Sequence, residues 1–341
     1  MTRRLYLHLG PAKTGTSAIQ HVLSGHDGSV VLYPRIGLWS DGSHHNLVLN
    51  YFGEYTRPEM VREDAGGLLE QIGEMARRSD RDLVISSEIL AGRRTLDEFA
   101  AALQKAVGCD LRVVLLFVVR EHFERAASLY NQRVKDAATS ERRDPDDFLI
   151  ENPERLCYAH QLRRLQRTDF DLRVLSYHPA EDCITRCLQF LGFPVEQIPE
   201  LPRRNISLGR TALVATLAAN RLVETPQDRS RFNEALSRIP GRFAPSEMFF
   251  GKDAVARVRP MFAADRKYLR REFGVKLPRA DLSNASPFTL SENDFADIAS
   301  AMASYADDRR PILDMVAHYV RHANNPSEPP EPELADKPRE A

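Results

Sequence analysis

The sequence contains no long apolar run. A membrane-spanning helix needs about 18 consecutive apolar residues, and no stretch of this chain provides them. The N-terminal segment, M-T-R-R-L-Y-L-H-L-G, lacks the apolar core and the cleavage site of a signal peptide. We therefore expect a cytoplasmic protein without a membrane span.

The sequence also lacks an excess of charge of one sign and any clustering of cysteines. Its 47 Lys and Arg residues are balanced by 48 Asp and Glu residues, whereas a general nucleic-acid binder is normally basic. The cysteines are Cys109, Cys157, Cys183 and Cys187, and no C-x-x-C or H-E-x-x-H pattern occurs. We therefore expect no nucleic-acid binding, no metal site and no disulfide framework. Nothing in the sequence specifies an oligomeric state.

What the sequence does contain is a phosphate-loop pattern near its N-terminus. An apolar run at residues 5–9 is typical of a buried strand, and apolar side chains recur at helical spacing from Ala18 onward. A glycine-containing loop between a strand and a helix directs backbone N–H groups and the positive end of the helix dipole at one point, which favours phosphate. An ordinary strand–turn–helix with polar capping residues is the alternative. The candidate phosphate ligands are Gly10, Lys13, Thr14, Gly15, Thr16 and Ser17.

The spacing of this loop distinguishes it from the loop of nucleoside triphosphatases. Their pattern, G-x-x-x-x-G-K-[ST], places lysine directly after the second glycine, whereas Lys13 stands two residues before Gly15. The string G-x-x-K-T-G-T-S is similar to the 5′-phosphosulfate loop of sulfotransferases. That family uses 3′-phosphoadenosine 5′-phosphosulfate (PAPS) as the sulfuryl donor. The resemblance implies that Lys13 stabilises charge on the leaving oxygen.

A second pattern strengthens this resemblance. Residues 112–119 form an apolar run that predicts a central parallel strand, and Arg120 and Ser128 follow at its end and on the next predicted helix, 121–132. An arginine and a serine in this spacing resemble the 3′-phosphate site of sulfotransferases. A guanidinium group suits phosphate because it binds bidentately. A surface arginine and an unrelated helix serine are the alternative.

The resemblance also implies a catalytic base. A third predicted strand, residues 82–87, ends at Glu88, where sulfotransferases carry histidine in their cytosolic branch and glutamate in their heparan-sulfate branch. His45 is the competing candidate, because it lies in a long aromatic-rich loop, residues 34–60, that we expect to border the acceptor. Ser86 replaces a lysine of the cytosolic branch, and Arg204 is a stand-in for that branch's C-terminal basic segment. These departures favour a bacterial or carbohydrate-type branch.

The alternation of predicted strands and helices indicates an α/β protein with a parallel β-sheet flanked by helices, which is the P-loop-like fold that the resemblance implies. Ligands bind at the carboxyl ends of such strands. We expect a PAPS-binding core over 1–202, a helical region without strands over 203–323, and a disordered Pro- and Glu-rich tail over 324–341. Further expected elements are a strand near 30–33, helices over 60–79 and 95–107, a strand over 172–177, and helices over 179–193, 210–223, 253–273 and 291–322.

The expected activity is transfer of a sulfuryl group from PAPS to a hydroxyl or amine, without a metal. The acceptor is expected to be a carbohydrate or another small molecule. A P-loop kinase or NTPase is the main alternative, and a non-catalytic nucleotide-binding protein of the same fold is another.

Overall fold

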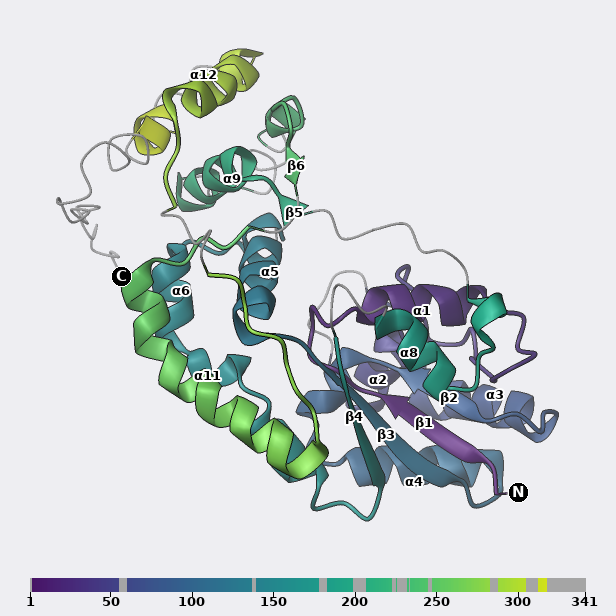
Figure 1. Ribbon diagram of the computed structural model, residues 1–341. Coiled ribbons are helices and arrows are strands. Elements are labelled where there is room, and N and C mark those ends of the chain that lie inside the picture. The colour runs from purple at the N-terminus through teal and green to yellow at the C-terminus, as the bar shows by residue number, and fades with distance from the viewer. Residues whose placement is uncertain are drawn as a thin grey trace, which may run out of the picture. The chain divides into compact units, whose positions relative to one another are not determined.

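The computed structural model describes most of the chain, in two compact units (Figure 1). The described residues are 2–54, 60–136, 139–177, 183–198, 207–222, 225, 232, 234–244, 247–282, 288–304 and 312–317. Unit 1 comprises Met1–Leu129, Leu149–Asn205 and Ala256–Asp281; unit 2 comprises Tyr130–Phe148, Ile206–Val255 and Leu282–Ala341. Each unit thus takes residues from both sides of the boundary expected at residue 202. The expected tail, 324–341, lies outside the described residues.

Unit 1 is built on a four-stranded parallel sheet with the order β2-β1-β3-β4 (Figure 1). The strands are β1 (Arg4–His8), β2 (Leu83–Ser86), β3 (Arg112–Val119) and β4 (Asp171–Ser176). β1 is a central strand, because Leu5 is paired with Leu83 on one side and with Val113 on the other. The loops that follow β1, β2 and β3 therefore leave the sheet at the same edge.

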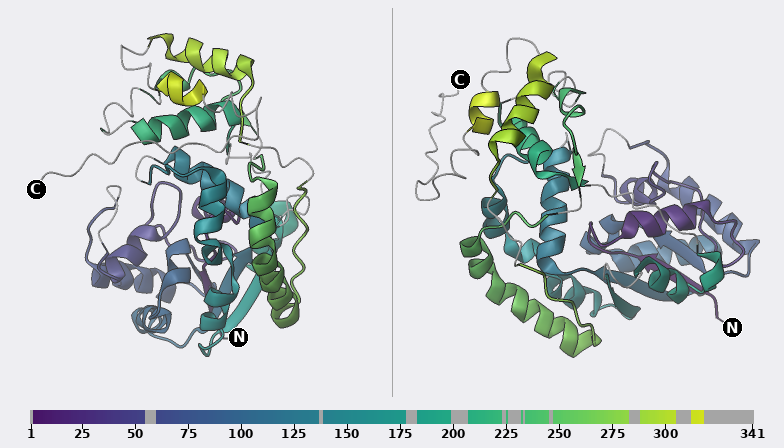
Figure 2. Two further views of the ribbon diagram at one scale, coloured as in Figure 1. Left: turned by 90° about the vertical axis from the view of Figure 1, so that its left-hand side faces the viewer. Right: turned by 45° about the horizontal axis from the view of Figure 1, so that its top comes forward.

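Helices cover both faces of this sheet, as Figure 2 shows from two further sides. The helices of unit 1 are α1 (Thr16–Gly25), α2 (His45–Tyr51), α3 (Ala65–Arg77), η1 (Glu88–Gly92), α4 (Leu96–Val107), η2 (Pro153–Leu156), α7 (Ala159–Leu165), α8 (Cys183–Phe190) and η3 (Val195–Gln197). Leu115 and Phe117 of β3 share a core with α3 and α4. Leu116 and Val118 share a second core with α1 and α8. Burial on both faces explains the unbroken apolar run of β3 and confirms the predicted fold class.

Three helices have residues in both units. These helices are α5 (His122–Lys135), α6 (Pro145–Glu151) and α11 (Lys252–Phe273), and the chain passes from one unit to the other within each of them. None of the helices found within the described ranges has the length and apolar content needed to cross a membrane.

Several predicted elements differ from those observed in unit 1. The expected strand near 30–33 is only an isolated bridge between Leu32 and Leu83. The segment 34–60 is not wholly irregular, because it contains α2; residues 55–59 lie outside the described part. The expected helix over 60–79 begins only at Ala65, where the Asp64 side chain accepts a hydrogen bond from the Gly67 N–H and caps it.

The described residues of unit 2 include two principal helices and a short antiparallel ribbon. They are α9 (Arg210–Leu222), α12 (Glu292–Ala301) followed by η4 (Met302–Ser304), and the ribbon of β5 (Ser207–Leu208) with β6 (Phe243–Ala244). The prediction of no strand over 203–323 was therefore wrong, because two-residue strands are too short to leave an alternating pattern. The expected helix over 291–322 is observed as α12, with helix again at residues 312–317.

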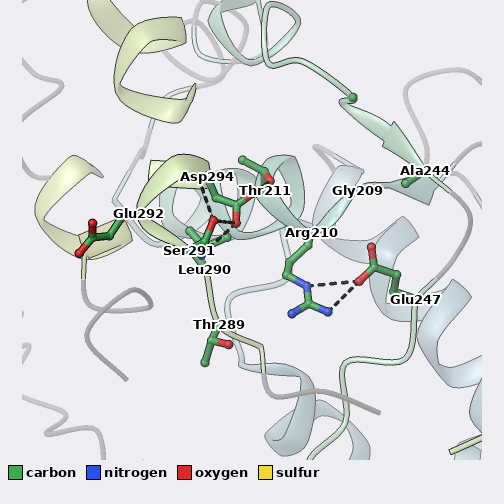
Figure 3. A pocket seen from close by; sticks show the side chains of 11 residues that line it. Gly209, Arg210, Thr211, Ala244, Glu247, Thr289, Leu290, Ser291, Glu292 and Asp294 are labelled. Atoms are coloured by element: carbon green, nitrogen blue, oxygen red, sulfur yellow. Dashed lines mark hydrogen bonds and ion pairs between the residues drawn. The ribbon is translucent and has the colours of Figure 1, made fainter. Parts of the chain in front are cut away.

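A polar cavity of about 710 Å³ opens in unit 2 beside the first turns of α9 and α12 (Figure 3). Its charged groups are largely paired with one another. Arg210 donates to Glu247 at 2.8 Å, and Thr211 donates to Asp294 at 2.5 Å. Asp294 and Ser291 also form the capping box of α12. These contacts explain the polar lining as capping and pairing within the unit.

Candidate functional site

The loop between β1 and α1 has an unusual backbone conformation. Lys13 has a φ of 73° and Gly15 a φ of 88°. The left-handed conformation costs a non-glycine residue roughly 1–2 kcal/mol, so the conformation of Lys13 is strained. Strain of this kind is concentrated at ligand-binding sites. A Cβ atom at Gly15 would lie 3.0 Å from the Tyr177 ring. Glycine is therefore needed at this position both because there is no room for a side chain and because φ is positive.

No side chain among the described residues caps the amino end of α1. The N-cap residue is Gly15, and the first turn has no acidic residue. Thr14 donates its hydroxyl hydrogen to the Pro11 carbonyl at 2.8 Å, and Thr16 donates to Glu88. The polar residues of the loop therefore do not act as ordinary helix caps. Ser17 is exposed.

Glu88 receives hydrogen bonds from three side chains. It follows β2 directly, and its carboxylate accepts from the Thr16 hydroxyl, from His45 Nε2 at 3.0 Å and from Gln20 Nε2 at 3.4 Å. Burial opposes ionisation of Glu88, but the hydrogen bond and charge of His45, together with the Thr16 hydroxyl, outweigh it and lower its pKa to about 2. The carboxylate is therefore ionised at neutral pH.

The position of His45 is fixed from three sides. A carboxylate only accepts hydrogen bonds, so the hydrogen between Nε2 and Glu88 belongs to the imidazole. Nδ1 lies 2.7 Å from the Ser87 hydroxyl, which donates to it when the ring is neutral. The Trp39 ring packs edge-on against the imidazole, with 4.9 Å between ring centroids. The two competing base candidates thus form one hydrogen-bonded pair.

Two residues of this network were missed in the sequence. Ser87 binds His45, and Gln20 links Glu88 to Ser86, whose hydroxyl lies 3.1 Å from Gln20 Nε2. Gln20 stands four residues after Thr16 on α1, so both side chains lie on one face of the helix. That spacing was a signal for Gln20. Ser87 carries no comparable signal, because its role depends on the position of α2.

Arg120 lies beside the loop between β1 and α1. It follows β3, and its Nη1 group donates to the carbonyl of Lys13 at 3.4 Å. Its guanidinium also donates to Glu124 at 3.2 Å and stacks over the Tyr177 ring at 5.0 Å. Ser128 lies further along α5 and is half-buried. Within the described part of the chain, no hydrogen bond joins Ser128 to Arg120. Arg204 lies outside the described residues.

The structure also brings together three side chains that could hold a metal. His122, Cys157 and Asp265 each offer a ligand atom within 4.8 Å of the others. Burial and the Asp265 charge raise the pKa of the Cys157 thiol to about 12, so the thiol is protonated. The Asp265 carboxylate already accepts hydrogen bonds from His122 and from two backbone N–H groups. We therefore assign this cluster a hydrogen-bonding role.

Comparison with known proteins gave matches to solved structures only. No protein-family model and no curated protein matches the chain. A crystal structure of a sulfotransferase from Alicyclobacillus acidocaldarius matches with 19% identity and a TM-score of 0.39, over 64% of this chain and 93% of that one. A sulfotransferase domain from the curacin biosynthetic pathway matches with 12% identity and a TM-score of 0.34, over 82% of this chain and 99% of that one.

A third match comes from the PezAT chromosomal toxin–antitoxin system of Streptococcus pneumoniae. It has 12% identity and a TM-score of 0.28, over 70% of this chain and 85% of that one. Two of these three structures are sulfotransferases. Identities and TM-scores this low do not establish a function, so the function is inferred from the side chains of the site.

Proposed function

We propose that this protein is a sulfotransferase that moves a sulfuryl group from PAPS to a hydroxyl or amine. The observation that carries the proposal is the strained loop at Lys13, with Glu88 and Arg120 at the same edge of the sheet. In the reaction, the bond from sulfur to the donor's phosphate oxygen breaks while a bond to the acceptor forms. The acceptor loses a proton, and adenosine 3′,5′-bisphosphate leaves with additional negative charge.

Donor binding is assigned to the loop and to β3 with α5. Lys13 and the open first turn of α1 suit the 5′-phosphosulfate, because both present positive charge or N–H donors to it. Arg120 suits the 3′-phosphate, with Ser128 as a further hydroxyl donor. Arg204 is assigned to close over the same phosphate. No divalent metal is required for this arrangement.

Proton transfer is assigned to the pair of His45 and Glu88. A carboxylate with a pKa of about 2 is a weak proton acceptor on its own. Its hydrogen bond to His45 places the imidazole where it can take part in the proton transfer. The aromatic ring of Trp39 beside His45 suits the face of a sugar or another ring, so a carbohydrate or small-molecule acceptor is proposed. A cytoplasmic location remains a prediction.

One contact favours the kinase alternative. P-loop kinases and NTPases hold Mg²⁺ with a loop Ser or Thr and with a carboxylate at a strand end. Glu88 lies at a strand end, and its hydrogen bond to Thr16 connects it to the loop, although Thr16 stands at the lysine position of the pattern and Ser17 at the hydroxyl position. Two observations oppose this alternative. His45 also forms a hydrogen bond to the Glu88 carboxylate, and Lys13 precedes Gly15 instead of following it.

A nucleotide screen separates the two functions. Melting temperatures are measured with adenosine 3′,5′-bisphosphate, ATP and GTP, each in EDTA and in Mg²⁺. Linkage predicts stabilisation of about 2.7 kcal/mol at a hundredfold excess over the dissociation constant. The proposal requires this effect for the bisphosphate in EDTA. Stabilisation by ATP or GTP that depends on Mg²⁺, without an effect of the bisphosphate, would identify the kinase alternative.

A further inference from the structure

The buried end of β3 is completed by a tyrosine side chain. The last residue of β3 that pairs with β4 is Val119, so the peptide groups of Arg120 lie beyond the ladder. Buried peptide groups need hydrogen-bond partners. Tyr158, which is fully buried, provides both of them: its hydroxyl accepts from the Arg120 N–H at 3.0 Å and donates to the Arg120 carbonyl at 2.6 Å. One phenol thereby fixes the backbone from which the Arg120 side chain extends.

Tyr158 is itself fixed by Asp265 of α11. The Asp265 carboxylate accepts from the N–H groups of Tyr158 at 3.0 Å and Ala159 at 2.8 Å, and it binds His122 Nε2 at 2.8 Å. Burial opposes ionisation of this carboxylate, but these hydrogen bonds outweigh it and lower its pKa. The Asp265 carboxylate thus holds both Tyr158 and His122, and His122 stands two positions after Arg120.

The Tyr158 ring also supports a buried arginine beneath the phosphate loop. The Arg125 guanidinium lies 5.1 Å from the ring centroid and is 6% exposed. Its Nη1 donates to the Leu156 carbonyl at 2.9 Å, and its Nε donates to the Ala12 carbonyl at 3.3 Å. Ala12 directly precedes the strained Lys13. Tyr158 is therefore connected to both proposed phosphate sites, through the Arg120 backbone and through Arg125.

We propose that Tyr158 is a positioning residue for donor binding, and that it acts by fixing Arg120 for the 3′-phosphate. This inference rests on the proposed function. Tyr158 acts through the two hydrogen bonds of its hydroxyl to the Arg120 peptide groups. Arg125 has the corresponding positioning role for the 5′-phosphosulfate, because it donates a hydrogen bond to the Ala12 carbonyl of the loop.

The direct test is Tyr158→Phe, which removes the hydroxyl and keeps the ring under Arg125. Dissociation constants are measured for adenosine 3′,5′-bisphosphate and for 5′-AMP. Two part-buried hydrogen bonds are lost, so we expect the bisphosphate constant to rise by about 5- to 30-fold, while the 5′-AMP constant stays within about twofold. The matched control is Tyr268→Phe. It removes another buried hydroxyl, which donates to Gln166 at 2.7 Å, and should leave the ratio of the two constants unchanged.

The ratio separates positioning from general destabilisation. An equal loss for both nucleotides, or no loss for either, would overturn the inference even if the variant melts at a lower temperature. If Tyr158→Phe does not fold, Asp265→Asn provides the test, because it weakens the hydrogen bonds that hold Tyr158. It should raise the bisphosphate constant more than the 5′-AMP constant, and an equal change in both constants, or no change, would overturn the inference. A wild-type protein that binds neither nucleotide would overturn the proposed function itself. A wild-type protein that binds both, with an unchanged ratio in Tyr158→Phe, would overturn only the role of Tyr158.

Discussion

The carboxylate of Glu88 accepts a hydrogen bond from the imidazole of His45, with 3.0 Å between Oε2 and Nε2. Both side chains are mostly buried, with 16% and 12% of their surface exposed. The Thr16 hydroxyl connects the same carboxylate to the first turn of α1. The proposed proton acceptor and the proposed phosphate loop are therefore parts of one hydrogen-bonded network.

Replacing either member of this pair should affect turnover more than donor binding. Glu88→Gln keeps the shape and removes the charge that holds His45, and loss of general-base catalysis costs a factor of about 10²–10⁴ in rate. His45→Ala removes the group that contacts Glu88 and should reduce turnover by a comparable factor. The measurement is the rate at saturating donor with any acceptor that the wild type sulfates. Near wild-type turnover in both variants would exclude the pair from proton transfer.

Acid should reduce the contribution of Glu88 to stability. The pKa of Glu88 is lowered from 4.5 to about 2 in the folded protein. A lowered carboxylate pKa stabilises the fold above the unfolded value, and this stabilisation is lost as the pH falls through the folded value. The difference in melting temperature between wild type and Glu88→Gln should therefore be largest above about pH 5 and should shrink toward about pH 3. A difference that grows on acidification would contradict the assigned direction of the pKa.

Gly15→Ala should destabilise the loop between β1 and α1 and weaken donor binding. The substitution places a Cβ atom against Tyr177 at a φ of 88°, and a strained backbone position costs on the order of 1–3 kcal/mol. We expect a lower melting temperature and weaker binding of adenosine 3′,5′-bisphosphate. Gly25→Ala is the control on the same helix, because its Cβ would meet no atom within 4 Å. Equal behaviour of the two variants would show that the loop conformation is not required.

Glu124 should compete with the donor for Arg120. The two side chains are 3.2 Å apart on neighbouring turns, so a phosphate that binds Arg120 must share it with a carboxylate. Glu124→Gln should tighten bisphosphate binding by roughly two- to fivefold, since a partly exposed pair contributes about 0–1 kcal/mol. Glu74→Gln removes the carboxylate of a more exposed pair, with Arg78 at the end of α3, and should have no effect. Weaker binding in Glu124→Gln would instead show that Glu124 orients Arg120.

The parts of the structure that could be predicted are those that local patterns determine. β3 was evident because a strand buried on both faces is continuously apolar, and the positions of Lys13, Glu88 and Arg120 at one edge followed from parallel topology. The seven-residue helices α2, α6 and α7 were missed, because helices this short have little intrinsic stability and depend on packing.

The contacts between distant residues could not be predicted. In α2, Asn50 is held by tertiary hydrogen bonds to the Val61 carbonyl and the Glu63 N–H. These bonds fix the helix that carries His45. The approach of His45 to Glu88, and that of Tyr158 to Arg120, depend in the same way on segments far apart in the chain. No spacing rule connects such residues.

The most direct test of the central claim is a titration in EDTA with adenosine 3′,5′-bisphosphate and with 5′-AMP, on wild type and Arg120→Ala. Hydrogen bonds to a charged group contribute about 1.5–3 kcal/mol, so Arg120→Ala should weaken the bisphosphate by about 10- to 100-fold and leave 5′-AMP nearly unchanged. This result would place the 3′-phosphate on Arg120 and support a PAPS-type donor. Wild-type binding of 5′-AMP as tight as that of the bisphosphate would contradict the account, as would a requirement for Mg²⁺.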